Sequence, residues 1–167
     1  WADSLLKAAK DFTATHSRSA GNGALMRSGI VGLTRLRDRE ATARAASAVA
    51  SLTHADPLVT DSCVLHAEAV RMAVIEGRLD LCAGLDLIPA QRRSQWTAWV
   101  DSAERADPAS IDGNGSTFGA LRAAWAAITS TDDRSSGHAR RALIAAVRAG
   151  HDTDTVAAIT GALVGAR

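Results

Sequence analysis

Tyrosine is absent from the 167-residue sequence, and aromatic residues make up only 4% of it. This scarcity argues against a β-sandwich, whose strands favour Tyr, Phe and Val, and leaves alanine and leucine to fill the interior. Both are strong helix formers, so the composition favours closely packed helices. At this length a single domain buries roughly 70% of its unfolded surface. The sequence therefore predicts one all-α domain.

An excess of charge of either sign is also missing. The 19 lysines and arginines balance 18 aspartates and glutamates, so no global field attracts nucleic acid or a membrane surface. There is no signal peptide and no apolar run of transmembrane length. The two cysteines, Cys63 and Cys82, are interpreted as buried thiols, although a disulfide between them is an alternative. We predict a cytoplasmic protein without nucleic-acid or membrane partners, in which local groups hold any anionic ligand.

Apolar residues recur at helical spacing along most of the chain. We expect Asp38 to cap one helix, and Pro57 to begin another that is apolar on all sides, up to Val74 and Ile75, and lies in the middle of the bundle. Residues 77–89 are expected to be less regular and to form a short helix or a turn. The predicted inward face of the helix after Asp38 is Ala41, Ala45, Ala48, Val49 and Leu52. The predicted helices span residues 2–13, 24–36, 39–52, 57–75, 91–106, 117–128, 138–148 and 155–166.

The first candidate binding segment runs from Ser19 to Arg27 and contains Gly21, Asn22 and Gly23. The segment precedes a predicted helix, so its backbone amides point outward at the positive end of the helix dipole. Glycines there let a phosphate approach the main chain closely. The alternative interpretation is a helix start capped by asparagine.

A second Gly-Asn-Gly, Gly113 to Gly115, precedes the helix that begins at Thr117. Together the two loops can form the walls of a groove, with Phe118 lining the groove or stacking on a base. A plain interhelical turn with Phe118 in the core is equally compatible with the local sequence.

The third candidate is Asp152-Thr153-Asp154-Thr155, followed by an apolar helix. Two carboxylates and a hydroxyl on one side of a tight turn are hard oxygen ligands, which suit Mg²⁺, Mn²⁺ or Ca²⁺. Helix capping by one of the aspartates is the alternative.

Two histidines and an acidic triplet complete the set of candidates. His54 precedes the central helix, where it can reach a hydroxyl or phosphate of a ligand, although it can also be a surface or capping residue. His66 lies within that helix and is predicted to be a core residue. Thr131-Asp132-Asp133 resembles a metal-ligand triplet, but it stands in a loop rich in Ser and Gly and is predicted to be a solvated turn.

Taken together, these segments resemble the ADP-ribosylglycohydrolase family, which includes dinitrogenase-reductase-activating glycohydrolase and the ADP-ribosyl-acceptor hydrolases. The order and approximate spacing of the segments are those of the family, and the resemblance covers nearly the whole chain. The matching residues are Gly21-Asn22-Gly23-Ala24-Leu25-Met26-Arg27, Thr53-His54 with Pro57-Leu58 and Asp61, Gly113-Asn114-Gly115, and Asp152-Thr153-Asp154-Thr155-Val156-Ala157-Ala158-Ile159 with Gly161-Ala162.

The resemblance implies a compact, orthogonal all-α bundle with two Mg²⁺ ions, or Mn²⁺ in their place, at the floor of a cleft for ADP-ribose. It implies that Asp152, Asp154 and Thr155 are metal ligands and that the two aspartates are catalytic. The implied substrate is an ADP-ribosylated protein or a small ADP-ribose conjugate. The residues implied to bind it are Ser19, Gly21, Asn22, Gly23 and His54 around the diphosphate and distal ribose, and Gly113, Asn114, Gly115 and Phe118 on the adenosine side.

The sequence departs from the family pattern before the first Gly-Asn-Gly. There the family carries a Gly-Asp-rich stretch with a glutamate and then a Thr-Asp-Asp-Thr motif, and neither is present. We therefore expect residues 1–167 to be the C-terminal portion of a single domain, whose N-terminal helices and metal ligands belong to the same domain but not to this sequence. The intact parent is expected to be the enzyme, and this stretch alone is expected to be inactive. The alternatives are a non-catalytic ADP-ribose or nucleotide-binding module, a structural role like that of a crystallin in the family, and hydrolysis of another N-glycoside.

Overall fold

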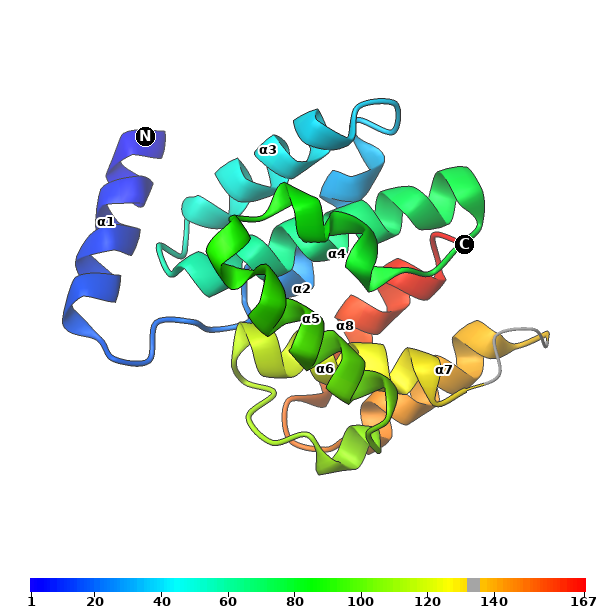
Figure 1. Cartoon of the computed structure of the whole chain (residues 1–167). Coiled ribbons are helices and arrows are strands. Elements are labelled where there is room, and N and C mark those ends of the chain that lie inside the picture. Colours follow the sequence, from blue (N-terminus) through cyan, green and yellow to red (C-terminus); the bar gives the residue numbers. More distant parts are fainter. Residues whose placement is uncertain (132–135) are drawn as a thin grey trace.

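The long helix α4 (Pro57–Glu76) runs through the middle of the protein, and most other helices pack around it (Figure 1). The computed structural model describes residues 1–131 and 136–167. Within this part of the chain the secondary structure is helical apart from one isolated β-bridge, which confirms the predicted all-α class. The other elements are α1 (Ala2–Thr15), α2 (Leu25–Ser28), η1 (Gly29–Leu33), α3 (Arg39–Ser51), η2 (Leu81–Leu87), α5 (Ala90–Glu104), η3 (Pro108–Ser110), α6 (Thr117–Thr129), α7 (His138–Arg148) and α8 (Thr153–Val164).

Helix α4 has strong signals at both ends. The Asp56 carboxylate accepts a hydrogen bond from the Leu58 amide at 2.9 Å, Pro57 occupies the first turn, and Gly77 ends the helix in the left-handed conformation at φ 63°. The side chains from Asp61 to Ala73 are all buried, so the predicted central position is confirmed. The prediction is wrong for Val74 and Ile75, which are partly exposed because the helix leaves the bundle in its last turn.

The predicted helix over residues 24–36 is interrupted. Helix α2 has only four residues and is followed by the 3₁₀ segment η1. Gly32 explains the close packing of this segment, since a Cβ there would lie 2.5 Å from the Ala67 carbonyl oxygen of α4. The η1 backbone therefore lies directly on α4, and it does so without a regular α-helix.

The helix after Asp38 forms as expected, but it buries a different face. The Asp38 carboxylate accepts from the Ala41 amide at 2.8 Å and caps α3. The buried side chains are those of Thr42, Ala43, Ala46 and Ala50, whereas Ala48 and Val49 are exposed. Alanines on several sides of this helix make its faces almost equally apolar, so the sequence pattern does not select one.

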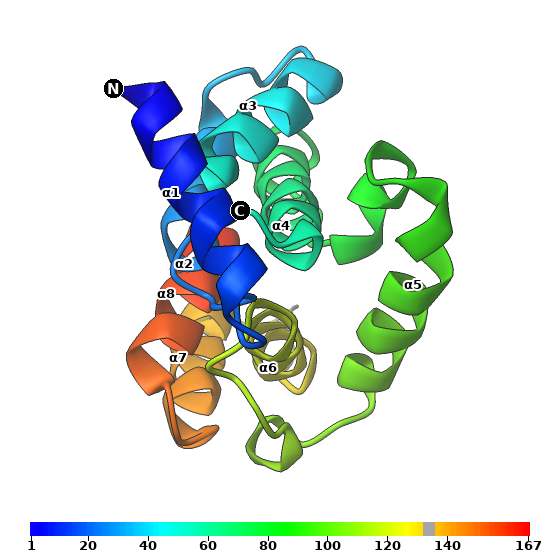
Figure 2. The same ribbon diagram turned by 90° about the vertical axis from the view of Figure 1, so that its left-hand side faces the viewer.

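Helix α1 stands apart from the other helices and is connected to them by an extended segment (Figures 1 and 2). Ala9 is its only buried residue, and Trp1 and Phe12 are exposed.

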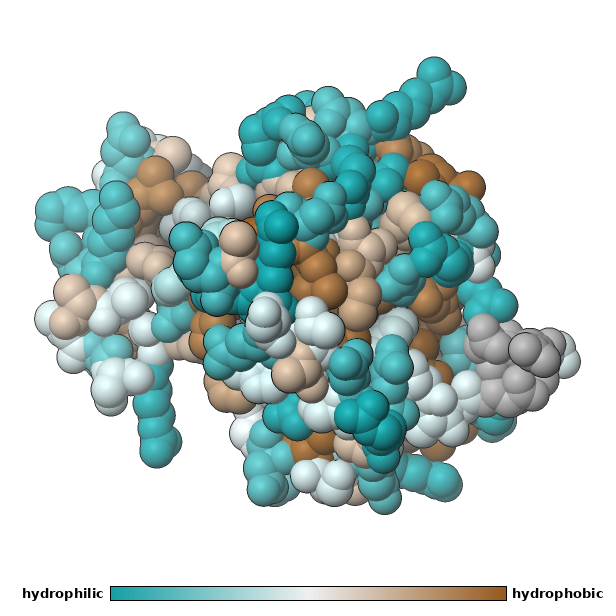
Figure 3. Space-filling view, viewed as in Figure 1, coloured by the Kyte–Doolittle hydropathy of each residue, from teal (hydrophilic) through white to brown (hydrophobic). Residues whose placement is uncertain are grey.

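Hydrophilic side chains cover most of the face shown in Figure 3. In the described part of the chain, no helix is both long enough and apolar enough to cross a lipid bilayer. Cys63 and Cys82 are free thiols, Cys63 buried and Cys82 half-buried.

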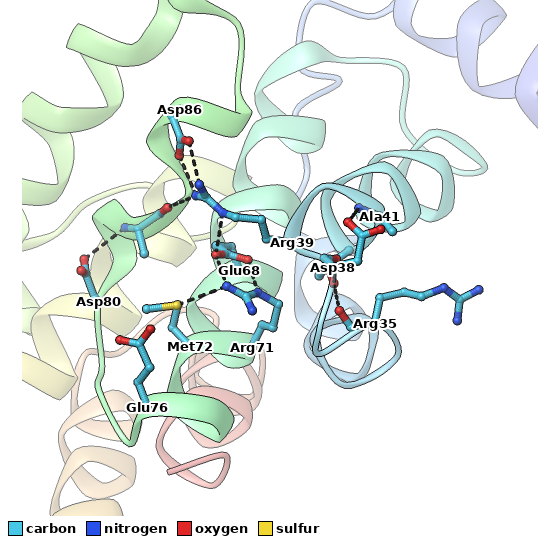
Figure 4. A network of polar contacts seen from close by, with 12 residues as sticks. Arg35, Asp38, Arg39, Ala41, Glu68, Arg71, Met72, Glu76, Asp80 and Asp86 are labelled. Atoms are coloured by element: carbon cyan, nitrogen blue, oxygen red, sulfur yellow. Dashed lines mark hydrogen bonds and ion pairs between the residues drawn. The ribbon is translucent and has the colours of Figure 1, made fainter.

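A buried charged cluster joins α4 to its neighbours (Figure 4). Glu68, which is 1% exposed, accepts from Arg71 at 2.7 and 2.8 Å and from Arg39 at 3.2 Å. Arg71 also donates to the Leu36 carbonyl at 2.8 Å, and Arg39 donates to Asp86 and to the Ala83 carbonyl of η2. The carboxylate therefore holds two guanidinium groups that fasten η2 and the chain before α3 to the central helix.

We predict that Glu68→Ala destabilises the protein by about 3–5 kcal/mol, because it leaves the buried Arg71 without its partner. The measurement is the free energy of unfolding in urea, followed by circular dichroism. The matched control is Glu40→Ala, which removes an exposed ion pair with Arg44 and should change stability by less than about 1 kcal/mol. Equal losses in the two variants would contradict the structural role of Glu68.

His66 is a core residue, as predicted from its position in α4. It is 1% exposed, and its Nε2 lies 3.1 Å from the Ile159 carbonyl oxygen of α8. Burial lowers the pKa of His66 to about 4. An unfolded histidine has a pKa of about 6.5, so between these values the unfolded chain binds a proton that the folded chain does not. His66 therefore stabilises the fold above pH 6.5 and loses that contribution as the pH falls.

We predict that His66→Gln weakens the pH dependence of stability. In the wild type, this histidine makes the free energy of unfolding fall by up to about 1.4 kcal/mol per pH unit between pH 6.5 and 4. Glutamine does not titrate, and the two proteins have all their other titratable groups in common. The difference between their slopes of unfolding free energy against pH therefore measures the contribution of His66. Urea unfolding at several pH values measures it. An unchanged slope in His66→Gln would contradict the prediction.

Candidate functional site

The two Gly-Asn-Gly loops, far apart in the sequence, lie side by side in the structure. The Thr117 amide donates to the Ala20 carbonyl at 2.8 Å, and Gly21 forms an isolated antiparallel bridge with Ser116. Gly119 makes this possible, because a Cβ there would lie 2.3 Å from the Gly113 carbonyl oxygen. The first turn of α6 therefore folds tightly under the second loop and holds it against the first.

Two buried asparagines join both loops to the start of α8. Asn22 Nδ2 donates to the Asn114 carbonyl at 2.8 Å and to Asp152 Oδ2 at 2.7 Å. Asn114 Nδ2 donates to the Gly150 carbonyl at 2.9 Å, and Asn114 Oδ1 accepts from the Asp152 amide at 3.2 Å. The three segments singled out in the sequence thus meet in one cluster.

Asp152 occupies the N-cap position of α8, but its side chain makes no capping hydrogen bond. The carboxylate accepts instead from Asn22, and this hydrogen bond lowers the pKa of Asp152, with further contributions from Thr155 and Asp154, while partial burial opposes the shift. Asp152 therefore does more than occupy the N-cap position of α8, since its carboxylate is joined to the distant Asn22. The exposed Asp154 side chain lies in the same turn.

A cavity of about 370 Å³ opens beside the first loop. Three of the predicted binding residues, Ser19, Gly21 and His54, line it. Ser19 is held in place by its hydroxyl, which donates to Asp56 Oδ2 at 3.1 Å. The other lining residues are Phe12, Thr13, Arg18 and Thr53.

The side of the loop that faces His54 is positively charged. A Cβ at Gly21 would lie 3.5 Å from His54 Nε2, and a Cβ at Gly23 would lie 3.6 Å from His54 Cε1 and 3.8 Å from the Arg27 guanidinium. Burial lowers the pKa of His54, and the nearby positive charge of Arg27 lowers it further against the opposing effect of Asp56. A neutral imidazole at physiological pH can either donate or accept a hydrogen bond with a ligand.

Two arginines of this site have no role in the sequence-based prediction. Arg18 lines the cavity, and Arg27 lies at Gly23 and His54. Arg27 is part of the segment that carries the family resemblance, which was the available signal for it. Arg18 stands in a polar stretch without periodicity, so nothing in the sequence distinguishes it from other surface arginines.

Other predicted residues lie elsewhere or have other partners. Phe118 stacks on Trp99 of α5, with ring centroids 5.1 Å apart. Asp61, part of the resemblance, is buried and accepts from Arg92 at 2.9 Å and from the Trp96 indole at 3.1 Å. In the second loop, Gly113 adopts the left-handed conformation at φ 73°. Asp132 and Asp133, predicted to form a solvated turn, lie outside the described residues.

The start of α8 offers oxygen ligands for a hard cation. Asp152 and Asp154 supply carboxylates, and the buried Thr155 supplies a hydroxyl that lies 3.6 Å from the sulfur of Met26 and also interacts with Asp152. Residues 1–131 and 136–167 contain no group of three or more His, Cys, Asp or Glu side chains that could hold a metal. Mg²⁺ commonly takes one or two carboxylates and keeps several waters, so this donor set fits Mg²⁺ in chemistry and in number.

Comparisons with known proteins agree with the arrangement of these segments. No curated protein matches the chain. A sequence model of the family described as ADP-ribosylglycohydrolase matches residues 2–167. The match spans the first glycine loop, the asparagine cluster and the start of α8, and the helical fold agrees with it. The chain therefore belongs to the ADP-ribosylglycohydrolase family.

Proposed function

We propose that this chain carries the ligand-binding loops and part of the metal site of a Mg²⁺-dependent hydrolase. The enzyme cleaves the glycosidic bond between ADP-ribose and a protein side chain or a small acceptor. The observation that supports this most is the 2.7 Å hydrogen bond from Asn22 to Asp152, which sets the acidic turn beside the first glycine loop. Membership of a glycohydrolase family supports hydrolysis in general.

The first loop and its cavity are suited to the diphosphate and the distal ribose. Gly21 and Gly23 let phosphate oxygens approach the main chain, and Arg18 and Arg27 supply positive charge. Ser19 and His54 can hydrogen-bond to ribose or phosphate oxygens from the same side. We assign the Gly113–Gly115 loop to the adenosine side. Phe118, stacked on Trp99, packs the base of that loop.

We assign Asp152, Asp154 and Thr155 as ligands of Mg²⁺, with Mn²⁺ as a substitute. When bound, the ion would act as a Lewis acid toward the ribose hydroxyls and a water molecule. A second ion needs more oxygen ligands than this turn supplies, so we propose that they come from an N-terminal part of the same domain outside these 167 residues.

The aspartates have a second role that follows from their charge. Hydrolysis of a glycoside proceeds through a transition state with oxocarbenium character, which neighbouring carboxylates stabilise. The lowered pKa of Asp152 keeps its carboxylate ionised at neutral pH, so it can stabilise positive charge or accept a proton from the attacking water. Asn22 fixes the orientation of this carboxylate through an uncharged donor and so preserves its negative charge.

The leaving group and the cellular setting belong to the same proposal. We propose an ADP-ribosylated protein or small ADP-ribose conjugate as the substrate and the cytoplasm as the location. The acceptor is to be identified by experiment, so arginine- and serine-linked substrates are compared in the same assay.

We predict that Asp154→Ala lowers the rate of ADP-ribose release by at least about a hundredfold, because it removes a ligand and a stabilising charge. The measurement, on the intact protein with the N-terminal part of the domain included, is turnover of ADP-ribosylated arginine and serine peptides in the presence of Mg²⁺, and removal of the ion with EDTA should have a similar effect. Asp154 is exposed, so the variant should unfold at the wild-type urea concentration.

Asp101→Asn, which changes an exposed aspartate on α5, is the matched control and should keep wild-type turnover. Wild-type rates in Asp154→Ala would refute the metal assignment. Calorimetry with ADP-ribose separates the main alternative: binding that is indifferent to EDTA, without turnover in the wild type, would identify a non-catalytic ADP-ribose-binding module.

A further inference from the structure

The side chains of the two asparagines in this sequence are both engaged by the protein itself. Asn22 and Asn114 are the only asparagines among the 167 residues, and both are buried. Asn22 Nδ2 uses its two hydrogens on the Asn114 carbonyl and on Asp152. Asn114 is 1% exposed. Its side-chain Nδ2 donates to the Gly150 carbonyl, and its Oδ1 accepts from the Asp152 backbone amide. One N–H and one lone pair of the Asn114 side chain remain, but its burial keeps them from a ligand.

The turn that Asn114 holds has an unusual backbone. Gly150 and His151 are consecutive residues in the left-handed region, with φ angles of 80° and 57°. This conformation is unfavourable for a histidine and persists only when surrounding contacts impose it. Asn114 supplies contacts at both ends of the turn, since it donates to the Gly150 carbonyl and accepts from the Asp152 amide.

We propose that Asn114 is a positioning residue for the reaction and not a substrate ligand. It fixes the Gly150–Asp152 turn from one side, and its own carbonyl accepts from Asn22, which orients the Asp152 carboxylate from the other side. This inference rests on the proposed function of Asp152. It replaces the expectation from the family resemblance that Asn114 touches the adenosine side of the substrate.

The two roles predict different kinetic effects. A substrate ligand contributes to binding, so its removal raises KM. A positioning residue acts on a group that works in the transition state, so its removal lowers kcat and leaves KM almost unchanged. Loss of a partner that orients a metal ligand also weakens metal affinity, commonly by 10- to 100-fold.

The experiment compares the intact wild-type protein, with the N-terminal part of the domain included, with its Asn114→Ala variant. We expect kcat for ADP-ribose release to fall by about a hundredfold with a change in KM below about threefold. Mn²⁺ alone, titrated and followed by electron paramagnetic resonance, should bind at least about tenfold more weakly. ADP-ribose binding in EDTA, measured by calorimetry, should stay within about threefold of the wild type.

Two further variants separate this role from a general loss of stability. His151→Pro keeps Asn114 but forces an exposed residue out of the left-handed conformation, so it should reproduce the loss of kcat and of Mn²⁺ affinity. This variant provides the test if Asn114→Ala does not fold. Thr42→Ala removes a buried hydroxyl on α3 that bonds the Arg35 and Asp38 carbonyls, and it should keep wild-type kcat and Mn²⁺ affinity.

The outcomes distinguish this inference from the proposed function. If the wild type releases ADP-ribose but Asn114→Ala mainly raises KM, or keeps wild-type Mn²⁺ affinity, the positioning role is wrong and the hydrolase proposal stands. If the intact wild-type protein, with the N-terminal part of the domain included, shows no metal-dependent turnover, the hydrolase proposal fails. The Mn²⁺ titration then decides the positioning role alone, because weaker binding in the variant supports it and equal or absent binding refutes it.

Discussion

The hydrogen bond from Asn22 to Asp152 is the contact on which the site depends. It joins residues 130 positions apart and links the first glycine loop to the start of α8. A neutral amide makes this link without cancelling the charge of the carboxylate, as a guanidinium or ammonium partner would do. The carboxylate therefore stays ionised and oriented, while the arginines beside Gly21 and Gly23 remain near the glycine loop. This amide is the direct side-chain link between the acidic and basic parts of the site.

The core has to hold three segments from distant parts of the sequence in register, and α4 provides the common support. It contacts α2 behind the first glycine loop, α6 behind the second, and α8 behind the acidic turn. His66 of α4 binds the Ile159 carbonyl of α8, and Ser62 contacts Thr117 at the start of α6. Glu68 fastens the opposite side of the same helix. The site is thus built at the ends of elements whose middles pack on one buried helix.

Where strong local signals mark the ends of a helix, the sequence was sufficient to predict it. Residues 138–148 form α7 as expected, because Gly137 and Gly150 bound an amphipathic segment. The predictions failed where local signals were weak or long-range packing decided. Alanines on every side of α3 concealed its buried face, and the contact of Gly32 with Ala67 replaced a predicted α-helix by η1.

The three segments of the candidate site could be predicted from their residue types, but the hydrogen bonds that join them could not. An asparagine between glycines is equally compatible with a cap, a turn and a long-range amide bridge, and only the fold distinguishes these roles.

A nearly neutral protein can bind a dianionic ligand and a divalent cation together only if it separates the two charges locally. The net charge is +1, so no long-range field favours either partner. Arg18 and Arg27 lie with the neutral His54 at the glycine loop, where the Asp56 carboxylate accepts from Ser19, and the carboxylates of Asp152 and Asp154 lie at the start of α8. Under the proposed function, a diphosphate attached to a ribose would satisfy both sides at once, with its phosphates near the arginines and its sugar hydroxyls toward the proposed cation. A free phosphate or a free nucleoside would meet only one side. The charge separation therefore favours a ligand that carries both groups, which is the chemistry of ADP-ribose.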